Sequence, residues 1–257
     1  MPSTPSSDFT GRPCRVAVVT GGLGGLGTAI CHALAQAGHR VIAVDVALPD
    51  DRLARFRDAT AGLEVETEAA DVADFGACAA LVQAVERRHG ALDILVNNAG
   101  ITRDATLRKM DHAQWQAVLE VNLGSAFNLC RHALEGMQAR GFGRIVNISS
   151  VSGQTGNFGQ TNYAAAKAGL HGFSMSLARE TAAKGITVNS ISPGYIETPM
   201  TQAMPEAVRE NTRAAIPVGR LGQPQDIART VAFLAAEDAG YITGANIPVN
   251  GGLYMGF

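Results

Sequence analysis

Short apolar runs rich in β-branched residues recur along the chain, and each is followed by a glycine, a small polar residue or an acid. Runs of this length are typical of strands that are buried on both faces of a parallel sheet. The predicted strands span residues 15–20, 41–44, 63–70, 94–96, 145–148, 186–191 and 245–249, of which 63–70 is the weakest.

Amphipathic or alanine-rich stretches occupy the intervals between the strands. The predicted helices run from a glycine-rich segment to about residue 37 and then span 49–59, 75–89, 113–140, 163–184, 206–212 and 224–236. Because strand and helix alternate without a linker or repeat, the sequence predicts a single α/β domain, a doubly wound parallel sheet with helices on both faces. We expect this domain to span residues 14–257, with a disordered tail at 1–13 and a substrate lid at about 196–217.

Composition narrows the class of protein. Of 257 residues, 46% are hydrophobic and 17% are charged, which suits a globular core and excludes a disordered chain. A net charge of −2 gives no electrostatic reason to bind nucleic acid or an anionic membrane, and no apolar run has the length of a membrane span. The start lacks the order of a signal peptide, and the cysteines form no C-x-x-C pair. We therefore expect a cytoplasmic protein with free thiols and no metal site.

A glycine cluster follows the first predicted strand and opens the first predicted helix. Gly21, Gly25 and Gly27 allow a tight turn and a close approach to a pyrophosphate, which the helix N-terminus would bind through its free N–H groups. Glycine turns between a strand and a helix are common, so the cluster alone is a weak signal. Its place in a strand–helix–strand unit of about 30 residues favours a dinucleotide site.

Asp45 ends the second strand, where a carboxylate can accept hydrogen bonds from both ribose hydroxyls of NAD. A 2′-phosphate would be repelled there, and no Arg or Lys stands next to Asp45 in the sequence or within the glycine loop. We therefore expect NAD/NADH to be preferred over NADP; the alternative is a solvated acid at a strand end. Asp71 and the segment 98–100 are further candidates, for the adenine amino group and the adenosine ribose, although they are also ordinary turn residues.

Three polar side chains are expected to converge at the end of the fifth strand. Tyr163 and Lys167 lie one helical turn apart, and Ser150 follows the strand that precedes their helix. A nearby ammonium is expected to lower the pKa of the phenol, so that Tyr163 can exchange a proton with a carbonyl oxygen that Ser150 also binds. Asn122, inside the predicted long helix, is either an ordinary exposed or capping amide or a residue that holds a water relaying protons to Lys167.

These motifs resemble the classical short-chain dehydrogenase/reductase family over roughly residues 15–252. The matching elements are Thr20-Gly21-x-x-x-Gly25-x-Gly27, Asn97-Asn98-Ala99-Gly100, Asn122, Ser150, Tyr163-x-x-x-Lys167 and Ser192-Pro193-Gly194. The resemblance implies a Rossmann-type fold with a seven-stranded sheet, a homotetramer and a catalytic tetrad of Asn122, Ser150, Tyr163 and Lys167. It also implies cofactor contacts from Gly21, Gly24, Gly25, Leu26, Gly27, Asp45, Asp71, Val72, Asn98, Ala99, Gly100, Tyr163, Lys167, Pro193, Gly194, Ile196 and Thr198.

Within the family, the chain is most similar to the acetoacetyl-CoA reductases of polyhydroxyalkanoate synthesis. The similarity is carried by residues 100–104, 143–150, 158–163, 167–173 and 192–196. It implies reduction of acetoacetyl-CoA to (R)-3-hydroxybutyryl-CoA, here linked to NADH, with substrate contacts from Ser150, Asn157, Phe158, Gln160, Tyr163 and Tyr195. Two residues depart from the subfamily: Asn157 replaces an expected glutamine, and Asp45 stands where the usual NADPH-dependent members lack an acid.

Other functions are compatible with the same residues. The 3-oxoacyl-ACP reductases share most of these segments, so the acyl thioester can be carried by CoA or by an acyl carrier protein. A dehydrogenase of another small ketone or 3-hydroxy acid would keep the chemistry and change the substrate. A non-catalytic NAD-sensing protein would keep only the fold, and it would have no chemical reason to retain four catalytic side chains at workable spacing.

Overall fold

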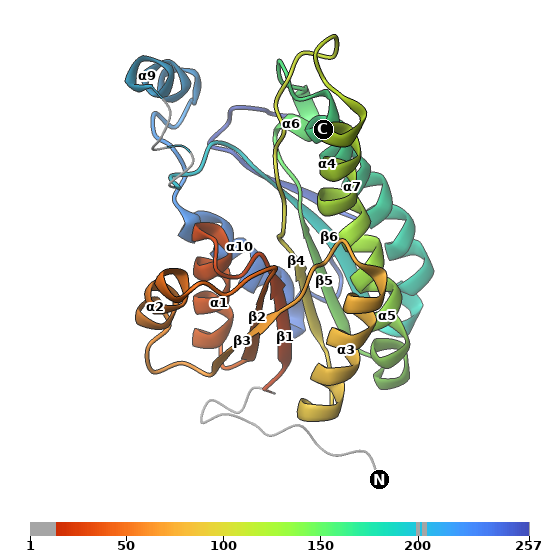
Figure 1. Cartoon of the computed structure of the whole chain (residues 1–257). Helices are drawn as coiled ribbons and strands as arrows, with labels where there is room; N and C mark the ends of the chain where they lie inside the picture. Colours follow the sequence, from red (N-terminus) through yellow and green to blue (C-terminus); the bar gives the residue numbers. More distant parts are fainter. Residues whose placement is uncertain (1–13, 199–200, 202–204, 257) are drawn as a thin grey trace.

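The computed structural model describes residues 14–198, 201 and 205–256, and its centre is a seven-stranded parallel sheet (Figure 1). The strand order is β3-β2-β1-β4-β5-β6-β7, so the chain crosses over once next to β1 and winds outward in both directions. The strands are β1 (Val16–Thr20), β2 (Arg40–Asp45), β3 (Val65–Ala69), β4 (Ile94–Asn97), β5 (Gly143–Ile148), β6 (Ile186–Pro193) and β7 (Asn246–Val249). The predicted fold class is confirmed.

Helices cover both faces of the sheet. In Figure 1, α1, α2 and α10 lie on one side and α3, α5 and α7 on the other, while α9 stands apart from the sheet. The helices are α1 (Gly25–Gln36), α2 (Asp50–Ala59), α3 (Phe75–His89), α4 (His112–Leu119), α5 (Ser125–Arg140), α6 (Ser152–Thr155), α7 (Thr161–Thr181), α9 (Glu206–Ala215) and α10 (Pro224–Ala235). None of the helices in the described ranges is both long and apolar enough to cross a membrane.

The alternation of side chains along each strand builds two hydrophobic cores. In β1, Ala17 and Val19 point to the core under α1 and α10, while Val16 and Val18 point to the core under α3, α5 and α7. Because both faces are covered, the central strands are apolar at almost every position. The edge strand β3 is only half-buried, which explains its weaker signal in the sequence.

The predicted helix at 113–140 is interrupted. A π-helical turn (Glu120–Gly124) separates α4 from α5, and Asn122 lies in it. Inside the wider turn, the Asn122 amide donates to the carbonyl oxygens of Ile101 and Val118, and such turns occur frequently at functional sites. The loop after β5, predicted without secondary structure, contains the short helix α6. The tail at 1–13 and the lid positions 199–200 and 202–204 lie outside the described residues.

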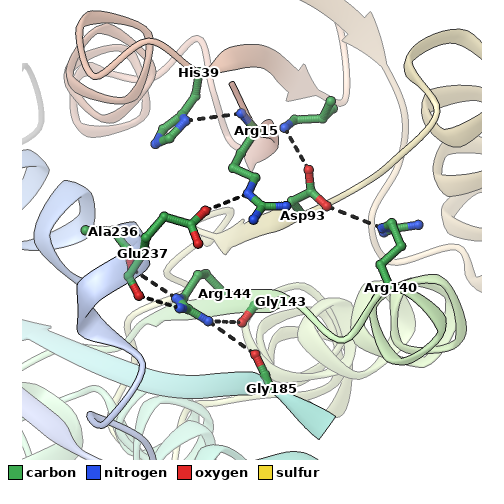
Figure 2. A network of polar contacts seen from close by, with 10 residues as sticks. Arg15, His39, Asp93, Arg140, Gly143, Arg144, Gly185, Ala236 and Glu237 are labelled. Carbon is green, nitrogen blue, oxygen red and sulfur yellow. Dashed lines mark hydrogen bonds and ion pairs between the residues drawn. The ribbon is translucent and has the colours of Figure 1, made fainter. Parts of the chain in front are cut away.

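Charged side chains tie together the amino-terminal edge of the sheet, opposite the predicted site (Figure 2). Arg144 is 4% exposed, and its guanidinium donates to the carbonyl oxygens of Gly143, Gly185, Ala236 and Glu237. Burial lowers the pKa of Arg144, but four carbonyl acceptors satisfy its donors. Arg15 and Arg144 also stack on the Phe142 ring. This network joins the starts of β1 and β5 to the end of α10. It lies at the amino-terminal ends of the strands, away from the predicted site.

Candidate active site

The carboxyl-terminal ends of β1, β2, β4 and β5 bring the predicted cofactor and catalytic residues to one edge of the sheet. At the centre of this edge, the Thr20 hydroxyl accepts hydrogen bonds from the backbone N–H groups of Asn98 and Ala99. The Asn98 amide in turn donates to the Thr20 carbonyl oxygen at 2.8 Å. The end of β4 is thereby fixed against the start of the glycine loop.

The glycine loop has the close approaches that its composition predicts. Gly21 has a φ of +61°, in the left-handed region that favours glycine. A Cβ on Gly27 would collide with the Gly21 carbonyl oxygen, and a Cβ on Gly22 would lie 2.7 Å from the Ala43 Cβ. At Gly24, by contrast, the nearest atom to a Cβ is 3.3 Å away. The loop is therefore closely packed at Gly22 and Gly27 and more open at Gly24. The free N–H groups at the start of α1 are suited to bind a pyrophosphate.

Asp45 is fixed at the end of β2 by three donors. Its Oδ2 accepts from the Leu23 N–H at 3.3 Å and from Arg52 at 2.9 Å, while its Oδ1 accepts from the Val46 N–H at 3.0 Å. Arg52 is a residue that the sequence argument missed: no cation adjoins Asp45 in the sequence, but the loop after β2 and the first turn of α2 carry one back to it. No sequence signal pointed to Arg52, because α2 carries several arginines.

Asp71 and Val72 follow β3 and differ in exposure. Asp71 is exposed, and its carboxylate caps the turn by accepting from the Ala73 N–H. The Val72 side chain is buried, and its carbonyl oxygen accepts from the Asn128 amide at 3.0 Å. Asp71 thus has the turn-capping role that the sequence allows, and adenine binding stays a prediction.

Ser150, Tyr163 and Lys167 meet where β5 ends and α7 begins. Lys167 is 3% exposed, and its Nζ donates to the Ile148 carbonyl oxygen at 2.8 Å. The same Nζ lies 5.5 Å from the centroid of the Tyr163 ring. Ser150 accepts a hydrogen bond from the Ser152 N–H, and its hydroxyl lies near enough to Tyr163 to lower the pKa of the phenol. The Tyr163 ring therefore has the Ser150 hydroxyl and the Lys167 ammonium as neighbours, as the spacing predicts.

Asn122 approaches the same group from the π-helical turn. It is 2% exposed, so the reading of it as an exposed amide is wrong. Its amide nitrogen has two carbonyl acceptors, whereas its buried Oδ1 has no protein donor among the described residues. A Cβ on Gly100 would lie 2.6 Å from this Oδ1 and 3.4 Å from Lys167 Nζ. Asn122 and Lys167 thus face one point above Gly100, and only glycine leaves that point free.

These features fit a nicotinamide dinucleotide: a glycine cradle at the start of α1, a fixed acid at β2 and an unpartnered buried oxygen beside a lysine. A family model described as enoyl-(acyl carrier protein) reductase matches residues 21–254. The chain belongs to the short-chain dehydrogenase/reductase family. It is an oxidoreductase, and the reductases of this family use a nicotinamide cofactor.

Similar curated proteins of this family include two kinds of reductase. The chain is 53% identical to an acetoacetyl-CoA reductase of Allochromatium vinosum, over 94% of this chain and 99% of that protein. It is 49% identical to an acetoacetyl-CoA reductase of Cupriavidus necator over the same shares. A 3-oxoacyl-[acyl-carrier-protein] reductase of Vibrio cholerae is 46% identical, over 94% of this chain and 98% of that protein.

The acid–base character of the short-chain reductase site differs in one respect from the sequence prediction. Burial raises the pKa of Tyr163, and the nearby Asp104 carboxylate raises it further, while the Ser150 hydroxyl lowers it. The sequence predicts that the Lys167 ammonium lowers this pKa; in the structure the burial of the ring is the largest effect, and the net shift is upward. Burial lowers the pKa of Lys167 to about 8. Tyr163 is accordingly held as a protonated phenol at neutral pH.

The predicted substrate residues fall into two groups. Gln160 is braced within its own loop, because its Oε1 accepts from Ser152 and Asn157 and its Nε2 donates to Asp104 at 3.0 Å. Phe158, in the same loop, is 88% exposed. Asp104 is another residue that sequence reasoning missed as a site residue, although it ends the segment 100–104 that carries the family resemblance. It anchors the loop after β4 to the loop before α7.

The second group is Tyr195, which lies with the predicted cofactor residues Pro193, Gly194, Ile196 and Thr198 at the end of β6 and just beyond it. The backbone N–H of Val151 donates to the Pro193 carbonyl oxygen, and the N–H of Gly194 donates to the Val249 carbonyl oxygen. Tyr195 and Ile196 line a pocket of about 240 Å³, together with residues near Arg220 and Asn250. Thr198 is hydrogen-bonded to Thr201. Pro193 and Gly194 are thereby held next to the loop that follows β5, on the side where the resemblance expects the nicotinamide.

Proposed function

We propose that the protein reduces the 3-oxo group of acetoacetyl-CoA to give (R)-3-hydroxybutyryl-CoA, with NADH as the reductant and Tyr163 as the proton donor. The observation that carries the proposal is the grouping of Ser150 and Lys167 around Tyr163, at the same end of the sheet as the glycine loop. Support for the substrate comes from relatives named acetoacetyl-CoA reductase at 49–53% identity over 94% of the chain.

In this mechanism the bound dinucleotide supplies the hydride that reduces the carbonyl carbon. Tyr163 donates its phenolic proton to the carbonyl oxygen, and its raised pKa keeps that proton in place until charge develops on the oxygen. Ser150 donates a hydrogen bond to the same oxygen. Lys167 stabilises the phenolate that remains and has N–H groups free for the nicotinamide ribose beyond the one given to Ile148. Asn122 presents its free Oδ1 on the route by which a proton returns through Lys167.

The pH dependence of reduction should report Lys167. Below about pH 8 the ammonium is charged and stabilises the phenolate, whereas above this pH it becomes neutral. Since the pKa of Tyr163 is raised, the phenol stays protonated through this range. We expect kcat/KM for reduction to fall as pH rises through about 8, measured by NADH oxidation from pH 6 to 10. In Lys167→Arg the residual activity should not fall as pH rises through this range, because a guanidinium stays charged. The same fall at the same pH in that variant would show that a group other than Lys167 causes it.

Kinetics with two thioesters test the proposed substrate. Protein, NADH and acetoacetyl-CoA are mixed, and loss of NADH absorbance is followed beside a reaction with acetoacetyl-ACP. We expect kcat/KM for the CoA thioester to exceed that for the carrier-protein thioester, because the relatives named acetoacetyl-CoA reductase share the higher identities. Turnover of the carrier-protein thioester alone would instead support the second candidate, a 3-oxoacyl-ACP reductase, which relatives at 45–46% identity favour. Turnover of neither would direct the search to other small ketones or 3-hydroxy acids.

Three further properties belong to the proposal. NADH preference rests on the fixed carboxylate of Asp45. A homotetramer is supported by exposed apolar side chains on two long helices, Phe127 on α5 at 51% and Met175 on α7 at 52% exposure. A cytoplasmic location rests on the expectation drawn from the composition and the cysteines. Polyhydroxyalkanoate synthesis as the setting and substrate contacts from Asn157, Phe158, Gln160 and Tyr195 rest on the resemblance.

A further inference from the structure

We propose that Arg52 is a latent binding group for the 2′-phosphate of an NADP-type dinucleotide, and that Asp45 keeps it out of use. The proposal rests on the dinucleotide site of the proposed function, but not on its acyl substrate. It makes cofactor preference a property of an ion pair rather than of Asp45 alone.

The geometry places a cation where the adenosine ribose is expected. Arg52 Nη2 lies 2.9 Å from Asp45 Oδ2, and the two side chains are 34% and 10% exposed. The same Oδ2 accepts from the Leu23 N–H in the glycine loop. Because two backbone N–H groups also hold the carboxylate, Asp45 cannot move away with Arg52 at small cost. The guanidinium is therefore held beside the acid that would bind the ribose hydroxyls.

The neighbouring charges leave Arg52 as the group best placed for this role. Arg55, on the next turn of α2, pairs with Asp51 at 2.8 Å, and both of these side chains are about 70% exposed, at 72% and 68%. Asp50 and Asp51 occupy the first turn of α2, where they favour the helix dipole. Arg52, by contrast, pairs with Asp45, which lies on a different element. Its Nη2 donates to Asp45 at the end of β2.

The ion pair explains how one site can discriminate. While Asp45 is ionised, a 2′-phosphate meets a like charge, and Arg52 is already bound to that charge. Once the carboxylate is replaced by a neutral side chain, the guanidinium has no charged partner and matches the geometry of a phosphate, which it can bind through two parallel N–H groups. A hydrogen bond to a charged group contributes about 1.5–3 kcal/mol, or about 10–100-fold in affinity.

A double-mutant cycle tests the proposal by binding alone. NADPH, NADH and adenosine 2′-monophosphate are titrated calorimetrically into the full-length wild type, Asp45→Asn, Arg52→Met and the double variant. We expect Asp45→Asn to bind NADPH and adenosine 2′-monophosphate about 10–100-fold more tightly than the wild type, with strong dependence on salt. The double variant should lose this gain. Arg52→Met alone should bind NADPH more weakly still, because Asp45 is then uncompensated.

Matched controls separate the proposal from other causes. Asp45→Asn/Arg55→Met removes an exposed arginine of the same helix and should keep the full gain for NADPH. Asp45→Asn/Arg52→Lys should keep part of it, because a charge remains without the fork. An equal gain for NADPH in Asp45→Asn and in the Arg52→Met double variant would overturn the proposal, and so would no gain in Asp45→Asn. No acyl substrate is present, so failure of acetoacetyl-CoA reduction leaves this result unaffected.

Discussion

Tyr163→Phe should lower kcat for acetoacetyl-CoA reduction by about 10²–10⁴-fold, the range supplied by a positioned general acid. The variant loses one hydroxyl, so no other group can deliver a proton at the position that Ser150 and Lys167 surround. NADH affinity should stay close to that of the wild type, because the ring still fills its place over Lys167 Nζ. Steady-state kinetics and a fluorescence titration with NADH measure the two quantities separately.

Tyr241→Phe is the matched control for this loss. Tyr241 is fully exposed in the segment before β7, and removal of its hydroxyl should leave kcat and NADH affinity unchanged. Full turnover in Tyr163→Phe would exclude Tyr163 as the acid. A parallel loss of NADH binding would instead show that the phenol contributes to the cofactor site.

The strands were predictable because burial on both faces demands continuous apolar runs. The π-helical turn at Asn122 was not, since the sequence through 113–140 has helical periodicity throughout. What decides the wider turn is tertiary: the Asn122 amide reaches Ile101 in the loop after β4 as well as Val118 in its own helix. A local pattern contains only the second of these partners.

The same distinction applies to the site. Ser150, Tyr163 and Lys167 were found because a strand end and one helical turn bring them together, whatever the rest of the chain does. Arg52 reaches Asp45 only through the path of the loop between β2 and α2. The direction of the Tyr163 pKa depends on its burial and on Asp104, which arrives from a different loop. Electrostatic effects of this kind follow from the fold and not from the spacing of residues.

Gly27→Ala should abolish dinucleotide binding and destabilise the fold. Alanine favours a helix over glycine by about 1 kcal/mol, so propensity alone predicts stabilisation at this position in the first turn of α1. The Cβ, however, would strike the Gly21 carbonyl oxygen and lie 2.8 Å from the Gly22 Cα. Both neighbours are backbone atoms, so the strain cannot be relieved by rotating a side chain, and overpacking of this kind costs about 1–3 kcal/mol.

In Gly27→Ala the steric clash can be removed only if the backbone of the glycine loop shifts. The same backbone forms the surface that a pyrophosphate would approach. We therefore expect a loss of at least about 100-fold in NADH affinity by calorimetry, together with a lower unfolding midpoint. Gly76→Ala, in the first turn of α3, is the matched control. Its Cβ would have as nearest neighbour Asp74 Oδ1 at 3.3 Å, the oxygen that caps α3 by accepting from the Ala77 N–H, so the loss of stability should not exceed about 1 kcal/mol and NADH affinity should be unchanged. If Gly27→Ala bound NADH as tightly as the wild type, the glycine loop could not be the pyrophosphate cradle, because its backbone would have moved without effect.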